Sequence, residues 1–89
     1  MLKIVITADG SRRHLRLIGD LRVEDLEELK RHLNGSSDDV TLDLEELKIV
    51  DLGAVLFLVG CEAGGIRILG CPYYVREWMY REKERRKPG

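Results

Sequence analysis

The chain reads Val40-Thr-Leu-Asp-Leu44, then a connector over residues 45–51, then Leu52-Gly-Ala-Val-Leu-Phe-Leu-Val-Gly-Cys-Glu-Ala63. Residues 40–44 alternate apolar and polar side chains, which is typical of a strand with one buried face. Nine of the twelve residues at 52–63 are apolar, and they surround the whole helical wheel, so we expect a deeply buried helix that Gly64-Gly65 ends. This succession predicts an α/β domain whose later strands pair in parallel.

Upstream, the pattern predicts an antiparallel hairpin and then a helix. Residues 2–7 and 14–19 each alternate in hydrophobicity, and Asp9-Gly10 between them is a strong turn signal. From residue 23 to residue 33 the apolar positions recur at helical spacing. This spacing predicts an amphipathic helix with a narrow apolar stripe of Val23, Leu26, Leu29 and Leu33.

Downstream, residues 66–69 form a short aliphatic run that predicts another strand, and Pro72 is well placed to begin a helix over residues 73–84. The expected order is strand, strand, helix, strand, helix, strand, helix. We therefore expect an α/β fold with a four-stranded mixed sheet and helices covering it. Residues 1–84 form a single domain in this interpretation, and residues 85–89 form a basic tail that frays.

Length and composition exclude several classes of protein. The chain has 89 residues, of which 44% are apolar and 35% charged, with a formal net charge of −1. This is the balance of one globular domain, and a net charge near zero argues against a nucleic-acid partner. The charges are segregated, because residues 20–51 carry an excess of acids and residues 76–89 an excess of bases.

Location and cofactors are also constrained. No apolar run approaches the roughly 20 residues that a membrane-spanning helix needs, and the first residues lack the pattern of a signal peptide. Two cysteines in such a chain indicate reduced thiols in a cytoplasmic setting. We expect no cofactor and no zinc site, since the cysteines and histidines are scattered singly. An acidic cluster of Asp43, Glu45, Glu46 and Asp51 fits either a Mg²⁺ site or a solvated acidic face, and the second is much commoner.

Cys71 is the one candidate nucleophile. It precedes Pro72 at a predicted helix start, where a thiol has its pKa lowered. The run Cys71-Pro-Tyr-Tyr-Val-Arg76 superficially suggests a phosphatase loop, but four residues instead of five separate the cysteine from the arginine, and the run lacks glycine. A small buried apolar residue is the more general role of such a cysteine.

The order of the motifs resembles a STAS domain, the fold of anti-sigma-factor antagonists and of the cytosolic parts of sulfate transporters. Residues 15–21 (Leu-Arg-Leu-Ile-Gly-Asp-Leu) resemble the second strand of that family, and residues 40–44 resemble its central strand. Residues 49–51 (Ile-Val-Asp), followed by a small apolar helix, resemble the segment that ends in Asp-Ser-Ser-Gly. Residues 70–78 resemble a group of small stand-alone bacterial STAS-like proteins.

One departure from the family pattern bears on function. In the antagonists the residue after the loop aspartate is a serine that a partner kinase phosphorylates, whereas here Asp51 is followed by Leu52. A leucine cannot accept phosphate, so the resemblance implies the fold and a partner surface without the phospho-switch. Arg22 also replaces the aspartate that follows the family's Gly-acid-Leu motif. Asp51 itself is placed to cap the helix that begins at residue 52.

We therefore expect a non-catalytic module of bacterial regulation that binds a protein partner, such as a kinase-like or other regulatory protein. The docking surface is expected to combine the Asp51 corner, the acidic helix and the aromatic last helix. The candidate partner-binding residues are Asp20, Asp51, Leu52, Gly53, Ala54, Tyr73, Tyr74, Arg76 and Trp78. Two alternatives stay open: a small thiol-dependent enzyme using Cys71, and a structural protein that forms homodimers through its last helix.

Overall fold

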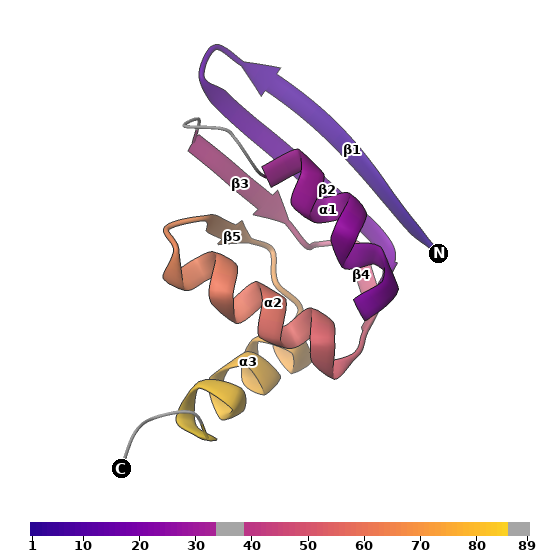
Figure 1. Cartoon of the computed structure of the whole chain (residues 1–89), viewed down its shortest axis with the longest axis vertical. Coiled ribbons are helices and arrows are strands. Elements are labelled where there is room, and N and C mark those ends of the chain that lie inside the picture. Colours follow the sequence, from indigo (N-terminus) through magenta and orange to yellow (C-terminus); the bar gives the residue numbers. More distant parts are fainter. Residues whose placement is uncertain (34–38, 86–89) are drawn as a thin grey trace.

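Five strands, one short 3-10 turn and three α-helices make up the described part of the chain, which in this computed structural model is residues 1–33 and 39–85. In chain order they are β1 (Leu2–Asp9), β2 (Arg12–Leu21), η1 (Val23–Asp25), α1 (Leu26–Leu33), β3 (Asp39–Asp43), β4 (Leu47–Val50), α2 (Leu52–Ala63), β5 (Arg67–Leu69) and α3 (Tyr73–Arg85). Figure 1 shows the sheet with α1 and α2 lying across it and α3 beside α2.

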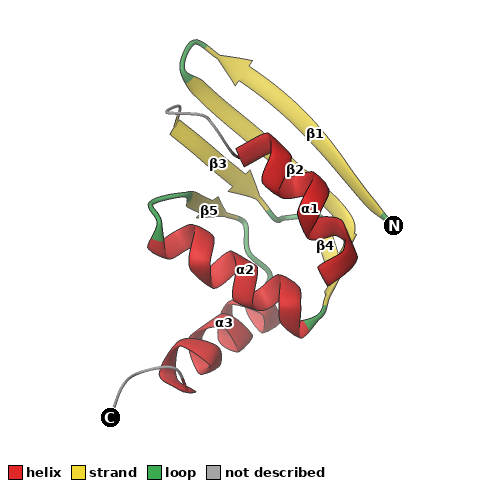
Figure 2. Cartoon of the chain, viewed as in Figure 1, coloured by secondary structure: helices red, strands yellow, loops and turns green. Residues whose placement is uncertain are grey.

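The sheet is mixed, and β2 is its central strand. The strand order is β1-β2-β3-β5, and β4 also pairs with β2. β1 runs antiparallel to β2, whereas β3 and β4 both run parallel to β2 and β5 runs parallel to β3 (Figure 2). β3 pairs with residues 12–16 of β2 and β4 with residues 19–21, so β2 has three partner strands.

A two-residue turn joins β1 to β2, as the Asp9-Gly10 signal predicts. Asp9 and Arg12 close the ladder, and Gly10, the first of the two turn residues, has φ +61°. Ser11 follows with negative φ, since no residue other than glycine has positive φ in the described chain. This is the pattern of a type II′ turn, which needs glycine at its first central position and fits the twist of a hairpin.

The core lies between one face of the sheet and the helices. Leu15 and Leu17 of β2 and Leu42 of β3 are fully buried on that face, as strand alternation predicts. The sheet and the loop after β3 also bury Leu21, Leu44, Leu47 and Val50, and the helices bury Leu26, Leu29, Ala54, Val55, Leu58, Cys61, Val75 and Met79. α2 is thus the buried helix that its all-round apolar pattern predicts, and Gly64 caps its end.

The mixed α/β sheet is confirmed, but the expected count of four strands is wrong. Residues 47–50, expected to belong to a connector, form the fifth strand. Leu47 and Val50 are buried and Ile49 is exposed, so the segment lacks the alternation of apolar and polar residues that predicts a strand. Its pairing depends on a shift of register between Gly19 and Asp20 in β2.

Two further expectations are refined by the described chain. The helix expected over residues 23–33 begins with the 3-10 turn η1 before α1. Of the expected tail at residues 85–89, Arg85 is the last residue of α3, and the others lie outside the described residues. Within residues 1–33 and 39–85, no helix has both the length and the apolar character needed to cross a membrane.

Candidate functional site

Two distant chain segments meet where the parallel strands β2 and β4 end. Asp20 is in register with Ile49, and Leu21 with Val50. The chain then enters η1 after β2 and α2 after β4, so both segments turn into helices at the same edge of the sheet (Figure 1). We call residues 20–23 and 49–53 the strand-end corner. In open α/β sheets, the region beyond the carboxyl ends of parallel strands is where binding sites form.

Asp51 holds the strand-end corner together. Its Oδ1 accepts a hydrogen bond from the Ala54 N–H at 2.9 Å, which is the predicted helix cap, and its Oδ2 accepts one from the Val23 N–H, also at 2.9 Å. The bond from Val23, opposed by burial and aided by the bond from Ala54 and the charge of Arg22, leaves the pKa of Asp51 below its ordinary value. With both oxygens bound to backbone, Asp51 fixes the geometry of the corner.

Three of the four exposed residues of the corner are apolar, and the fourth is Arg22. Val23 is 57% exposed, Ile49 47% and Leu52 49%. Gly53 lies under Val23, because a Cβ built on Gly53 would be 3.0 Å from the Val23 Cβ and Cγ2 atoms. Ala54 is fully buried, which corrects the expectation that its side chain belongs to the partner surface.

Asp20, one of the candidate partner-binding residues, lies at the corner, and its carboxylate has two basic neighbours. Its Oδ2 is 3.4 Å from the amino group of Met1 and 3.6 Å from Nη2 of Arg22. Arg22 itself is exposed, and its N–H donates to Asp25 Oδ2 at 3.0 Å. The charges at the corner are therefore mixed and surround the apolar side chains.

Tyr74 brings the start of α3 to this corner. Its hydroxyl donates a hydrogen bond to the carbonyl of Lys48, which is the neighbour of Ile49 in β4. Burial, together with the charges of Cys71 and Asp20, raises the pKa of Tyr74, which keeps the phenol protonated as a donor. Along α3 a shallow groove of about 340 Å³ is lined by Tyr73, Tyr74, Glu77, Trp78 and Arg81. Tyr73 is 81% exposed, so the aromatic face of α3 extends the apolar surface.

Arg76 makes an ion pair within the chain that the sequence does not predict. Its Nη1 lies 2.8 Å and 2.9 Å from the two carboxylate oxygens of Glu62 on α2, and Lys83 Nζ lies 3.1 Å from the same carboxylate. Burial would raise the pKa of Glu62, but the bonds and charges of Arg76 and Lys83 lower it overall. Arg76 therefore joins α3 to α2, and its place in a partner surface stays a prediction.

Both cysteine thiols have a raised pKa. Burial raises the pKa of Cys61 to about 11. Burial also raises the pKa of Cys71, more than the charge of Arg76 lowers it. The expectation that a helix start lowers the pKa of Cys71 is therefore wrong, because loss of solvent outweighs the favourable charge.

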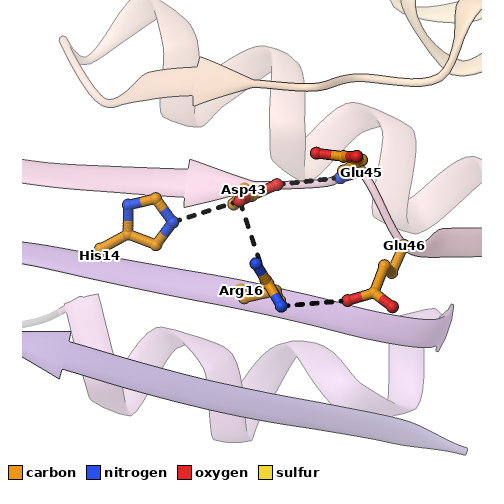
Figure 3. Close-up of polar contacts among 5 residues, drawn as sticks. All are labelled: His14, Arg16, Asp43, Glu45 and Glu46. Carbon is orange, nitrogen blue, oxygen red and sulfur yellow. Dashed lines mark hydrogen bonds and ion pairs between the residues drawn. The ribbon is translucent and has the colours of Figure 1, made fainter.

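A polar cluster on the sheet face opposite α1 and α2 is visible only in the structure (Figure 3). Asp43 Oδ2 lies 3.2 Å from His14 Nε2 and 3.9 Å from Arg16 Nε, and Arg16 Nη1 lies 3.3 Å from Glu46 Oε2. The bond from the Glu45 N–H, opposed by burial and aided by His14 and Arg16, lowers the pKa of Asp43. The register of β2 on β3, which places Arg16 beside Asp43, brings these groups together, and local sequence carries no signal of it.

The acidic residues that lie close together in the sequence have different surroundings in the structure. Asp43 is bound to His14 and Arg16, whereas Asp51 is bound to the backbone of Val23 and Ala54. Within the described residues, His, Cys, Asp and Glu side chains form no group of three arranged to hold a metal ion.

Comparison with known proteins yields matches in structure alone. No protein-family model matches the chain, and no curated protein gives a significant match. The antisigma-factor antagonist STAS domain from Rhodobacter sphaeroides matches with a TM-score of 0.55 and 23% identity, over 79% of this chain and 85% of that one. An uncharacterised protein of the DUF3478 family with a SpoIIAA-like fold, from Shewanella loihica, matches with a TM-score of 0.51 and 22% identity, over 99% of this chain and 80% of that one.

A third solved structure, that of Mglu, matches with a TM-score of 0.52 and 25% identity over 73% of this chain, which corresponds to only 18% of Mglu. The two smaller proteins are matched over most of their length, and they share the fold that the order of motifs in this sequence predicts. The mixed sheet, the helices on it and these superpositions together show that the chain has the STAS fold, also described as SpoIIAA-like.

Proposed function

We propose that this chain is a non-catalytic protein-interaction module, similar to anti-sigma-factor antagonists, that binds its partner through the strand-end corner and lacks the phospho-switch. The observation that carries the proposal is the set of three exposed apolar side chains, Val23, Ile49 and Leu52, around a carboxylate whose two oxygens are already bound. Exposed apolar side chains grouped on a small domain and surrounded by polar groups are typical of a protein-binding surface.

The corner is rigid as well as apolar. Asp51 links η1 to α2, and Tyr74 links α3 to β4, so three helical elements are held at one place. A preorganised surface loses little conformational entropy on binding, which favours recognition of a folded partner. Tyr73 and Trp78, which line the groove along α3, are residue types enriched in binding hot spots.

The same corner supports constitutive binding. Leu52 occupies the position of the family's phosphorylated serine, and residues 52–58 carry no hydroxyl group. We infer that the partner, a regulatory protein of the cytoplasm and a candidate for a kinase-like protein, meets the same apolar surface at all times. Regulation then lies with the partner or with the amount of this chain.

A photo-crosslinking experiment tests the proposal. A photoreactive phenylalanine analogue is placed at Leu52 and, in a matched control, at Leu69, which is 46% exposed but belongs to β5. Irradiation in an extract of the source organism should give one crosslinked protein from position 52 and none from position 69, identified by mass spectrometry.

The purified partner then allows a direct measurement by calorimetry. Leu52→Asp should weaken binding at least about tenfold, because it places a charge in a desolvated contact, whereas Leu69→Asp should leave it unchanged. Equal crosslinking from both positions, or equal affinity of the two variants, would contradict the proposal.

The thiol-enzyme alternative is tested by the reactivity of Cys71. A thiol whose pKa is raised should react with a disulfide reagent at pH 7.5 much more slowly in the folded chain than in urea, because little thiolate is present. Rapid, stoichiometric modification of the folded chain would restore the enzyme hypothesis. Cys61, with a pKa of about 11, serves as the internal reference for an unreactive thiol.

A further inference from the structure

β1 forms a free margin of the sheet. It has eight residues, and in the described chain it pairs only with β2 (Figure 2). The Asp20 N–H donates to the Met1 carbonyl at 3.2 Å, which fixes the phase of the ladder. Since bonded and non-bonded pairs alternate in an antiparallel ladder, the N–H and C=O groups of Leu2, Ile4, Ile6 and Ala8 point away from β2.

Within residues 1–33 and 39–85, this margin lacks the features that usually protect an edge strand. Proteins block such edges with proline, bulges, a covering element or charges in the middle of the strand. In β1 the middle is apolar, with Val5 39% and Ile6 44% exposed, and the β1–β2 register runs without a shift from Leu2 to Asp9. The only charges of the strand, Lys3 and Asp9, lie near its two ends, and neither has an ion-pair partner among residues 1–33 and 39–85.

These charges make β1 complementary to itself. We propose that β1 pairs with β1 of a second copy of this chain, antiparallel and two-fold symmetric, with Ile6 opposite Ile6. Ile4 then lies opposite Ala8, Val5 opposite Thr7, and Lys3 opposite Asp9, twice by symmetry. The two sheets become one continuous sheet, joined away from the strand-end corner, so the inference is independent of the proposed function.

The phase of the ladder selects this register. The outward backbone groups of Ile4, Ile6 and Ala8 meet the same groups of the second copy, and a slip of one residue would lose every one of these bonds. Lys3 and Asp9 fall at non-hydrogen-bonded positions, where opposite side chains approach most closely. A slip of two residues, with Val5 opposite Val5, places Lys3 opposite Thr7 and Asp9 opposite Met1, so both Lys3–Asp9 pairs are lost.

Each copy contributes only one strand to the interface, so the buried area is small. We therefore expect weak association, as in transient complexes. Sedimentation velocity of the whole chain at low ionic strength, up to about 1 mM, should therefore show a concentration-dependent dimer. Lys3→Asp and Asp9→Lys should each lower the association constant about tenfold, since two attractive pairs become two repulsive pairs. The double variant carrying both changes should restore it.

A backbone variant provides a second measurement. Ile6→Pro removes an N–H that points away from β2, so the hairpin should keep its circular dichroism while the dimer is lost. Ile6→Thr keeps the N–H and the branched Cβ atom and is the matched control, which should still dimerise. A monomer at all concentrations overturns the proposal, and so does a dimer that survives the single charge reversals, which would point to another surface such as α3.

Should Ile6→Pro unfold the chain, the charge reversals decide alone, because Lys3 and Asp9 are exposed and make no contact that the fold needs. Restoration of the dimer in the double variant supports the register. If both single variants fold but dimerise weakly, and the double variant does not restore the dimer, the register is wrong and the proposal with it.

Discussion

At the scale of single residues, Asp51 shows how much one carboxylate can organise. Its role as a helix cap follows from the sequence, since a carboxylate before an apolar helix accepts free backbone N–H groups, and the bond from Ala54 confirms it. Its second bond, from Val23, joins residues 28 positions apart and could not be predicted locally. The same holds for His14 and Asp43, which only the pairing of β2 with β3 brings together.

Asp51→Ala should lower the free energy of unfolding by about 2 kcal/mol, because a cap is lost and the Val23 N–H loses its partner. Asp51→Asn, which keeps one acceptor oxygen, should cost less. Urea denaturation measures both, and Glu27→Ala on the exposed face of α1 is the control, expected within about 0.5 kcal/mol of the parent chain. A loss no larger than that of the control would mean that the corner does not depend on Asp51.

Two glycines should respond to alanine in opposite directions. Gly19 has φ +96°, and a Cβ there would be 2.6 Å from the Met1 carbonyl oxygen, so Gly19→Ala should destabilise the fold by more than about 1 kcal/mol. Gly60 lies within α2 with nothing within 4 Å of its Cβ position, so Gly60→Ala should stabilise by about 0.5–1 kcal/mol. Melting temperatures that shift in the same direction for both variants would contradict this account.

At the scale of elements, the long and strongly patterned segments were predictable and the short strand β4 was not. Twelve mostly apolar residues predict α2, and the turn signal with its flanking alternation predicts the hairpin. β4 has four residues, and its buried side chains Leu47 and Val50 are three apart, a spacing that fits a helix as well as a strand. Only its tertiary pairing with the end of β2 makes it a strand.

α3 should owe its attachment to Met79 more than to Trp78. Met79 is fully buried, whereas Trp78 is partly exposed in the α3 groove. Met79→Ala should therefore cost about 2–5 kcal/mol of unfolding free energy, and Trp78→Ala distinctly less. Chemical denaturation of the two variants shows which loss of unfolding free energy is larger. Truncation after Arg76 removes both residues and should cause a larger loss than either substitution. A greater loss in Trp78→Ala would reverse the assignment of core and surface on α3.

At the scale of the whole molecule, the bases of α3 have acidic partners, but these partners lie on α2 and on α3 itself and not in the acidic segment 20–51. The bases of α3 meet acids: Arg76 and Lys83 contact Glu62, Arg81 pairs with Glu77, and Arg85 pairs with Glu82. The helix therefore presents aromatic side chains between paired charges. The spacing of Glu77 and Glu82 from Arg81 and Arg85 can be read in the sequence, whereas the contact of Arg76 and Lys83 with Glu62 cannot, because Glu62 belongs to another helix.

The stability of the domain should fall in acid. Asp43, Asp51 and Glu62 have pKa values below their ordinary 3.8, 3.8 and 4.5, so the unfolded chain binds protons before the folded chain does. Their contribution is complete above those ordinary values and is lost as the pH falls through the lowered ones. Urea midpoints should stay level from pH 7 to about pH 5 and then decrease, with a shallower decrease in Asp51→Asn. Rising stability between pH 5 and pH 3 would contradict the assignment.

The three partners of β2 also order the events by which the chain folds. Its pairing with β1 closes a turn of two residues, and a hairpin of this kind forms in about 1–10 μs. Its pairings with β3 and β4 must wait for the loops of intervening chain to close, an entropic cost that precedes any gain from contact. The antiparallel hairpin is thus the template on which the parallel half of the sheet assembles. We therefore expect the strand-end corner, which needs β4 and α2 in place, to be among the last parts of the molecule to acquire its native form.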